Sequence, residues 1–102
     1  FVFTAGQVAW DDTGEVIGIG DIVVQTEQTL GNVLSVLAEG GACAGDVLKC
    51  TVYLKDIADF QKMNEVFART FGDDPPARTT VEAHLAEPTM LVEIEAIAFV
   101  GQ

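Results

Sequence analysis

The spacing of apolar residues along the chain predicts two helices. In the first, Asp21 is a candidate N-cap, apolar positions then recur at helical intervals, and Gly40 and Gly41 form a natural stop. The second helix begins after Asp56 or Asp59, either of which could cap it, and runs to about residue 71. Its apolar stripe consists of Phe60, Met63, Phe67 and Phe71. Each helix is therefore expected to pack one face against a core.

Alternation of apolar and polar residues predicts the strands. The chain opens in strand-like sequence over residues 1–8, and a turn at "DDTGE" leads to a short extended piece. Further strands are predicted over 48–54, 77–85 and 90–100, the last two joined by a corner near Pro88. The order strand, strand, helix, strand, helix, strand, strand is typical of an α+β domain. We expect both helices on one face of a mixed sheet.

The two C-terminal strands carry an unusual mixture of residues. In the strand over 77–85, the set Thr79, Val81, Ala83 and Leu85 is expected to face the helices. The opposite set is then Arg78, Thr80, Glu82 and His84. In the strand over 90–100, one face combines two carboxylates with large apolar residues: Leu91, Glu93, Glu95, Ile97 and Phe99.

This mixed face is typical neither of a solvent-exposed sheet surface nor of a buried core. A solvated sheet surface would not normally carry Ile97 and Phe99, and a core face would not carry two carboxylates. We therefore expect a homo-oligomer packed sheet against sheet, with Arg78 and a carboxylate in a cleft between protomers. The alternative is a set of cross-strand surface ion pairs, each worth under ~1 kcal/mol.

Composition limits the classes of function. The 102 residues are 49% hydrophobic, with a mean hydropathy of +0.32, which fits one domain over 1–102 with apolar surface for other subunits. Sixteen acidic against five basic residues give a net charge of −11. This charge argues against nucleic acid and anionic membranes as partners. No signal peptide and no apolar run of ~18 residues is visible, so we expect a cytoplasmic protein.

Few residues could carry metal or thiol chemistry. Cys50 alternates with apolar residues in the strand over 48–54, so a buried structural thiol is expected. The two cysteines and one histidine do not make a zinc set, and no metal is predicted. His84 lies roughly 20 Å along an extended strand from Arg78, too far to share one small substrate. Asn64 shares the stripe of the second helix, either as an amide at the core margin or as one directed into a pocket.

The segment "PARTTVEAHLAEPTMLVEIEAIAF" (76–99) resembles the signature of the RidA (YjgF/YER057c/UK114) family, also labelled endoribonuclease L-PSP. The resemblance continues upstream in "FTAGQV" and in "GDVLKCTVYLKDIADFQKMNEVF", so it covers essentially the whole chain. It implies a chorismate-mutase-like α+β sandwich that assembles as a homotrimeric barrel. Ligand sites would lie in the clefts between subunits.

The same resemblance implies an activity and its residues. Members of the family hydrolyse reactive enamines and imines such as 2-aminoacrylate to 2-oxo acids and ammonia, without metal or organic cofactor. The carboxylate-binding arginine falls on Arg78, and the glutamate beside the catalytic water falls on Glu93. Asn64 and Gly6 match the family's binding asparagine and glycine. Thr80 stands where many members have a cysteine that makes backbone contacts.

The chain also departs from the family pattern. An N-terminal segment with a site-lining aromatic residue precedes "FVFTAGQ" in the family and is missing from this sequence. Ala5 replaces a serine found in many members, which removes a possible hydrogen bond. A second hypothesis is therefore a protein that binds 2-oxo acids at Arg78 without catalysis. A third is an endoribonuclease or translation inhibitor, against which the net charge of −11 and the single histidine weigh.

Overall fold

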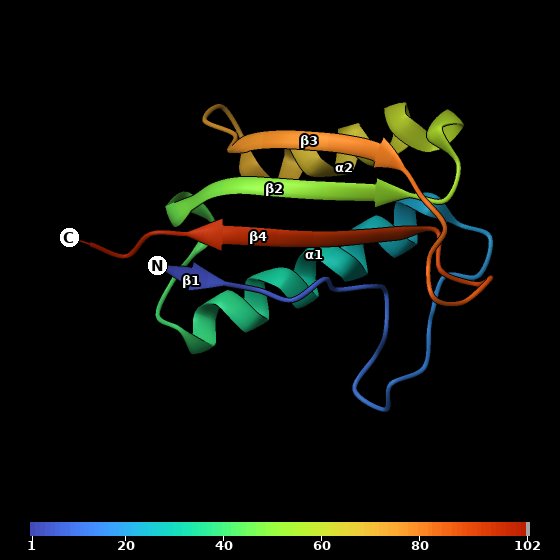
Figure 1. Cartoon of the computed structure of the whole chain (residues 1–102), viewed down its shortest axis with the longest axis horizontal. Coiled ribbons are helices and arrows are strands. Elements are labelled where there is room, and N and C mark those ends of the chain that lie inside the picture. The colour runs from blue at the N-terminus through green and yellow to red at the C-terminus, as the bar shows by residue number, and fades with distance from the viewer. Residues whose placement is uncertain (102) are drawn as a thin grey trace.

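A four-stranded mixed sheet with both helices on one face forms the protein (Figure 1). The structure, a computed structural model, describes residues 1–101. Its strand order is β1-β4-β2-β3. The elements are β1 (Val2–Phe3), α1 (Ile22–Glu39), β2 (Val47–Leu54), α2 (Phe60–Phe71), β3 (Ala77–Glu82) and β4 (Val92–Ala98), with short 3-10 turns η1 (Ala44–Asp46) and η2 (Ile57–Asp59). The α+β class and the two-helix layer are confirmed.

Local capping explains where α1 begins and where α2 ends, whereas the N-cap position of α2, Asp59, makes no side-chain cap bond. The Asp21 carboxylate accepts hydrogen bonds from the Val23 and Val24 amides at 3.1 and 3.2 Å, so it caps α1 as predicted. Asp56 instead caps η2, the turn that leads into α2. Gly72 ends α2 with a φ of +68°, a conformation that favours glycine. No helix among the described residues is long and apolar enough to span a membrane.

The N-terminal strand is shorter than predicted. β1 covers only Val2–Phe3, after which the Ala96 amide donates to the Thr4 side-chain oxygen rather than to a main-chain carbonyl. Pairing resumes only at an isolated bridge between Gln7 and Ile94, and the expected extended piece makes one bridge, Trp10 to Val16. Here a side-chain oxygen takes the place of the main-chain carbonyl that would otherwise accept this ladder hydrogen bond. The backbone after Phe3 is thereby shifted out of register with β4, which explains why β1 is interrupted.

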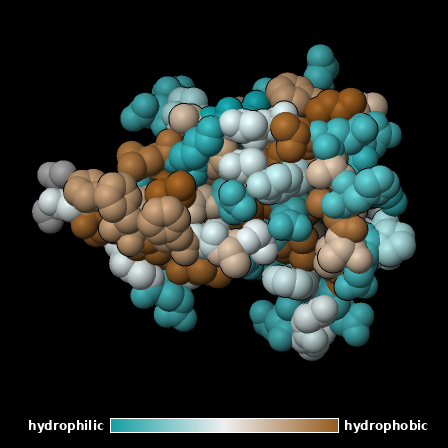
Figure 2. Space-filling model, viewed as in Figure 1, coloured by the Kyte–Doolittle hydropathy of each residue, from teal (hydrophilic) through white to brown (hydrophobic). Residues whose placement is uncertain are grey.

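The core lies between the sheet and the helices. Alternate residues of β2 and β4 are fully buried there and pack against α1 and α2. They are Cys50, Val52, Leu54, Val92, Ile94 and Ala96. The other face of the sheet, here called the open face, carries the half-buried residues Lys49, Thr51, Tyr53, Glu93, Glu95 and Ile97. Figure 2 looks onto the side of the molecule shown in Figure 1, where apolar side chains gather near the two chain ends.

The predicted facing of the strand at 77–85 is wrong. Arg78 is the direct partner of Cys50, so its side chain lies on the helix side of the sheet, whereas Thr79 and Val81 are exposed on the open face. The strand also ends at Glu82, not at residue 85. β3 is an edge strand with one neighbour, so its helix side is only partly covered. A long arginine can pack its stem there and still reach solvent.

The expected buried thiol is confirmed for Cys50. Burial raises the pKa of Cys50 to about 11, against the opposing effect of Arg78 and Lys49. Because the thiolate is the nucleophile, iodoacetamide near neutral pH is expected to modify the exposed Cys43 and leave Cys50 unmodified until the protein is denatured. Mass spectrometry after digestion checks this, with Cys43→Ser as control. Labelling of Cys50 in the native protein would contradict its placement.

Candidate functional site

Arg78 lies in an aromatic cradle at the start of β3. Its guanidinium carbon lies 4.7 Å from the ring centroid of Phe67 and 5.3 Å from that of Phe60, both on α2. Its Nη1 donates a 2.7 Å hydrogen bond to the Asn64 amide oxygen. These rings and the amide share one face of α2, because positions 60, 64 and 67 repeat at helical spacing. Cation–π contact and the hydrogen bond together fix the guanidinium plane.

A cavity of about 370 Å³ opens beside this guanidinium. It is lined by Asn64, Phe67, Ala68, Gly72, Pro75, Pro76 and Arg78. None of the lining residues is acidic, so the charge of Arg78 is not neutralised there. Burial lowers the pKa of Arg78, but an arginine stays protonated in proteins. The cavity therefore presents a fixed cation with free donors, which suits a small anion such as a carboxylate.

The free edge of β3 carries unpaired backbone groups on either side of the Arg78 side chain and beyond it. The Ala83 amide donates to the Leu54 carbonyl, so the alternate residues Arg78 and Thr80 turn their amides and carbonyls to the unpaired edge. Within residues 1–101, the buried Thr80 hydroxyl has no hydrogen-bond partner. We call Arg78, Asn64 and the Thr80 backbone the arginine half-site.

Glu93 occupies a second polar position, on the open face. It is the direct cross-strand partner of Tyr53 and lies against Gly6. A Cβ added to Gly6 would collide with the Glu93 carboxylate, so any larger residue would have to displace that carboxylate. Partial burial and the carboxylates of Glu95 and Glu93 raise the pKa of Tyr53. We call Glu93 and Gly6 the glutamate half-site.

The two half-sites lie on opposite faces of the sheet. Arg78 lies on the same face of the sheet as its β2 partner Cys50. Glu93 lies on the same face as its β2 partner Tyr53, which is three residues after Cys50 and therefore points to the opposite side. The prediction that Arg78 faces away from the helices, as Glu93 does, is therefore wrong. Cross-strand ion pairing of Arg78 is wrong as well, because its side-chain partner is Asn64. Among residues 1–101 the one ion pair joins Arg69 and Glu27.

The remaining candidates lie apart from both half-sites. His84 is exposed in the loop over 83–91, and Glu82 accepts a hydrogen bond from the Ile57 amide. Within the described part of the chain, no group of three or more metal-binding side chains comes together. Reasoning from sequence did not assign Phe60 and Phe67 to the site. The signal was present, because both share the helical stripe of Asn64.

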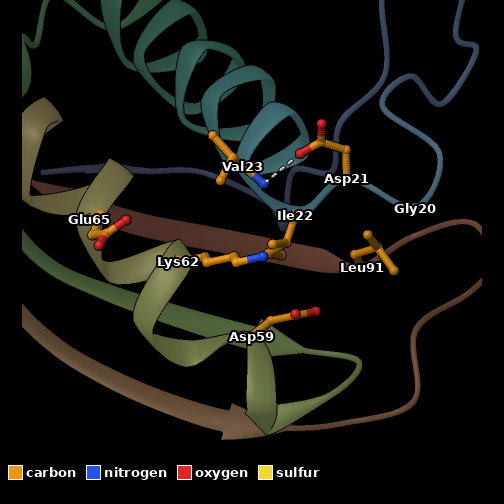
Figure 3. A pocket seen from close by; sticks show the side chains of 8 residues that line it. All are labelled: Gly20, Asp21, Ile22, Val23, Asp59, Lys62, Glu65 and Leu91. Atoms are coloured by element: carbon orange, nitrogen blue, oxygen red, sulfur yellow. Dashed lines mark hydrogen bonds between the residues drawn. The ribbon is translucent and has the colours of Figure 1, made fainter.

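Another cavity, of about 500 Å³, lies between the first turn of α1 and the start of α2 (Figure 3). Lys62 reaches across it toward Ile22, while Asp21, Asp59 and Glu65 supply three carboxylates (Figure 3). Asp21 already serves as the helix cap. The surplus of negative charge makes this cavity a poor receptor for an anionic substrate, which leaves the Arg78 cavity as the better candidate.

Comparison with known proteins assigns the chain and its fold to a family. A profile described as Endoribonuclease L-PSP matches residues 1–100. The chain belongs to this family, the RidA (YjgF) family, and the resemblance inferred from sequence is confirmed.

Particular relatives cover nearly the whole chain. A RutC family protein of Pyrococcus abyssi is 48% identical over 100 residues, which are 97% of this chain and 78% of that protein. The 3-aminoacrylate deaminase RutC of Acinetobacter baylyi is 32% identical over 99 residues, 97% of this chain and 79% of that protein.

Solved structures agree with the fold. The YjgF gene product of E. coli superposes with a TM-score of 0.85 at 36% identity, covering 94% of this chain and 77% of that one. E. coli TdcF with bound serine has a TM-score of 0.88 at 33% identity, covering 97% of this chain and 80% of that one. The sandwich architecture expected from the sequence is thus shared with solved members of the family.

Proposed function

We propose that this protein hydrolyses small 2-enamino and 2-imino acids to 2-oxo acids and ammonia. The observation that carries the proposal is the unneutralised Arg78 guanidinium, held by Asn64 and two aromatic rings beside an acid-free cavity. A relative named 3-aminoacrylate deaminase and a family structure with bound serine support a small carboxylate-bearing ligand.

The arginine half-site would bind the substrate carboxylate. One guanidinium nitrogen is committed to Asn64, and the remaining donors can grip two carboxylate oxygens in a planar fork. The amides on the free edge of β3 supply further donors next to it. This binding fixes the substrate's second carbon relative to the cleft and removes most of its orientational freedom.

The glutamate half-site would supply the proton chemistry. The enamine first tautomerises to the imine, whose C2 is electrophilic. Solvent protonates the imine nitrogen, water adds to C2 of the resulting iminium, and the Glu93 carboxylate takes a proton from that water to give an amino alcohol. Glu93 returns this proton to the amino nitrogen, the C–N bond breaks as the hydroxyl oxygen forms the carbonyl, ammonia leaves, and the hydroxyl proton passes to solvent. The product is the 2-oxo acid, with one water consumed per ammonia released.

Two copies of the chain would be needed to complete each site. Because Arg78 and Glu93 lie on opposite faces, one protomer's arginine half-site must meet its neighbour's glutamate half-site. The open face, with Ile97 half-buried and Phe3 and Phe99 exposed, is the surface for this contact. A homotrimer, as the family resemblance implies, closes such head-to-tail contacts into a ring.

A mixed-oligomer experiment tests the shared site. Arg78→Ala and Glu93→Gln chains, each inactive alone, are expected to regain activity when co-expressed with different tags and purified as mixed oligomers. Random mixing should restore about a quarter of the sites, because each intact site needs one specific neighbour pair. Sites built within single chains would recover nothing, since every chain would still carry one lesion.

The direct test of activity separates this proposal from its alternative. 2-Aminoacrylate generated in situ should be converted to pyruvate and ammonia faster with the protein than in buffer. A second candidate is binding of 2-oxo acids without turnover, favoured by Ala5, which lacks a hydroxyl beside Gly6. That candidate predicts 2-oxobutyrate binding at Arg78 with an unchanged imine lifetime.

The exposed free thiol of Cys43 fits a reducing, cytoplasmic location for either activity.

A further inference from the structure

Gln25 is a fully buried amide that binds two main-chain groups of a distant loop. Its Nε2 donates to the Thr89 carbonyl at 2.8 Å, and its Oε1 accepts from the Leu91 amide at 2.9 Å. The side chain lies on the buried face of α1, and its exposed fraction is 0%. Burying an amide in a core is unfavourable unless both its donor and its acceptor are satisfied. Both are satisfied here by the loop over 83–91.

This clamp acts where β4 begins. The Leu91 carbonyl in turn accepts from the Lys55 amide at 3.0 Å, so the Leu91 peptide groups are held from both sides. Glu93 follows two residues later. The neighbouring Met90 is buried, which anchors the same segment by packing. Gln25 and Lys55 thus hold the backbone directly before β4, two residues from Glu93.

The same helix also holds the backbone on the other side of Glu93. The Asn32 amide nitrogen donates to the carbonyls of Val8 and Trp10, each at 2.9 Å. This segment follows Gly6 and pairs with β4 through Gln7 and Ile94, whose amides and carbonyls exchange hydrogen bonds of 2.8 and 2.9 Å. Side-chain amides of α1 thus fix both backbone segments that meet in the glutamate half-site.

We propose that Gln25 is a positioning residue for Glu93. It touches neither substrate nor water, and acts by holding the Thr89–Leu91 backbone so that the Glu93 carboxylate meets the water at the right distance. The inference rests on the proposed function for its effect on turnover. The clamp itself is a property of the folded chain and can be tested without any substrate.

The activity test compares Gln25→Met with Thr26→Val. Met keeps the shape of Gln but loses both hydrogen bonds. Thr26 is equally buried on α1 and its hydroxyl bonds only within the helix, to the Ile22 carbonyl, so it is the matched control. Gln25→Met is expected to lower kcat about tenfold to a hundredfold, since a misplacement of roughly 1 Å is that costly, and to leave KM nearly unchanged. Thr26→Val should alter the stability of the protein without lowering kcat selectively.

Hydrogen exchange of the Leu91 amide provides a readout independent of activity. In the parent this amide should exchange as slowly as the amides inside β4, and in Gln25→Met much faster, with Thr26→Val like the parent. If Gln25→Met does not fold, Gln25→Leu, which also lacks both hydrogen-bonding groups, serves in both comparisons. Fast exchange of Leu91 in the parent, or equal kcat in the Gln25 and Thr26 variants, would overturn the proposal. An inactive parent with a protected Leu91 would reject the deaminase function and leave the clamp standing.

Discussion

An Arg78→Lys protein is expected to bind 2-oxobutyrate about tenfold to a hundredfold more weakly than the parent, because one charge-assisted hydrogen bond and the planar fork are lost. Lysine keeps the charge, but it cannot bond Asn64 and two carboxylate oxygens in one plane. Isothermal titration calorimetry measures the change. Loss of turnover should accompany it, since the carboxylate positions the reacting carbon.

Arg69→Lys is the matched control for this substitution. Arg69 lies on α2 as well, but it is exposed and makes a 3.6 Å surface ion pair with Glu27. Surface pairs of this kind contribute little, so the control should bind 2-oxobutyrate like the parent. Equal affinity of the Arg78→Lys and Arg69→Lys proteins would remove Arg78 from the binding site, whatever the catalytic result.

The second large effect is expected for Glu93→Gln. The amide keeps the size of the side chain beside Gly6 but cannot accept a proton from water, so kcat should fall about a hundredfold to ten-thousandfold. KM should change little, because the carboxylate of the substrate binds at the arginine half-site. Stopped-flow or coupled assays of pyruvate formation measure both constants.

Glu95→Gln tests whether the effect belongs to Glu93 alone. Glu95 lies on the same face of β4, two residues along, and faces Thr51 rather than Gly6. Its substitution removes the same charge from the open face without removing the proposed base. A fall in kcat equal to that of Glu93→Gln would show that the net charge of this face, and not one carboxylate, governs the rate.

The helices and their ends could be predicted from sequence because local rules determine them. Asp21, Gly40 and Gly72 act through hydrogen bonds and backbone conformations that involve only nearby residues. The β2 and β4 segments were also recognisable, since both alternate strictly and each buries one set of residues.

The orientation of β3 could not be obtained in the same way. Its two faces are similarly mixed, and assigning the more apolar set to the core placed Val81 inside and Arg78 outside, the reverse of the structure. What decides the matter is non-local: the register with Cys50 and the aromatic side chains of α2 that receive the guanidinium. Edge strands are covered on too small an area for hydrophobicity alone to set their facing.

The position of Gln25 in the sequence already indicated a buried polar side chain that must have a hydrogen-bond partner. Gln25, Thr26 and Thr29 occupy positions of α1 whose spacing places them among the buried apolar residues. A polar residue on the apolar stripe of a helix must have a partner, yet the sequence does not show that the partner is the main chain of residues 89 and 91. Such long-range side-chain to backbone bonds become visible only once the fold is known.

On the proposed mechanism, the placement of the two half-sites on opposite faces of one sheet would make activity depend on the concentration of the protein. A chain separated from its neighbours would hold a receptor with no base and a base with no receptor. On the proposed mechanism, turnover per chain would therefore fall on dilution below the dissociation constant of the assembly, although each chain stays folded. Assembly would therefore be required for turnover, and the protein concentration would determine what fraction of the chains is active.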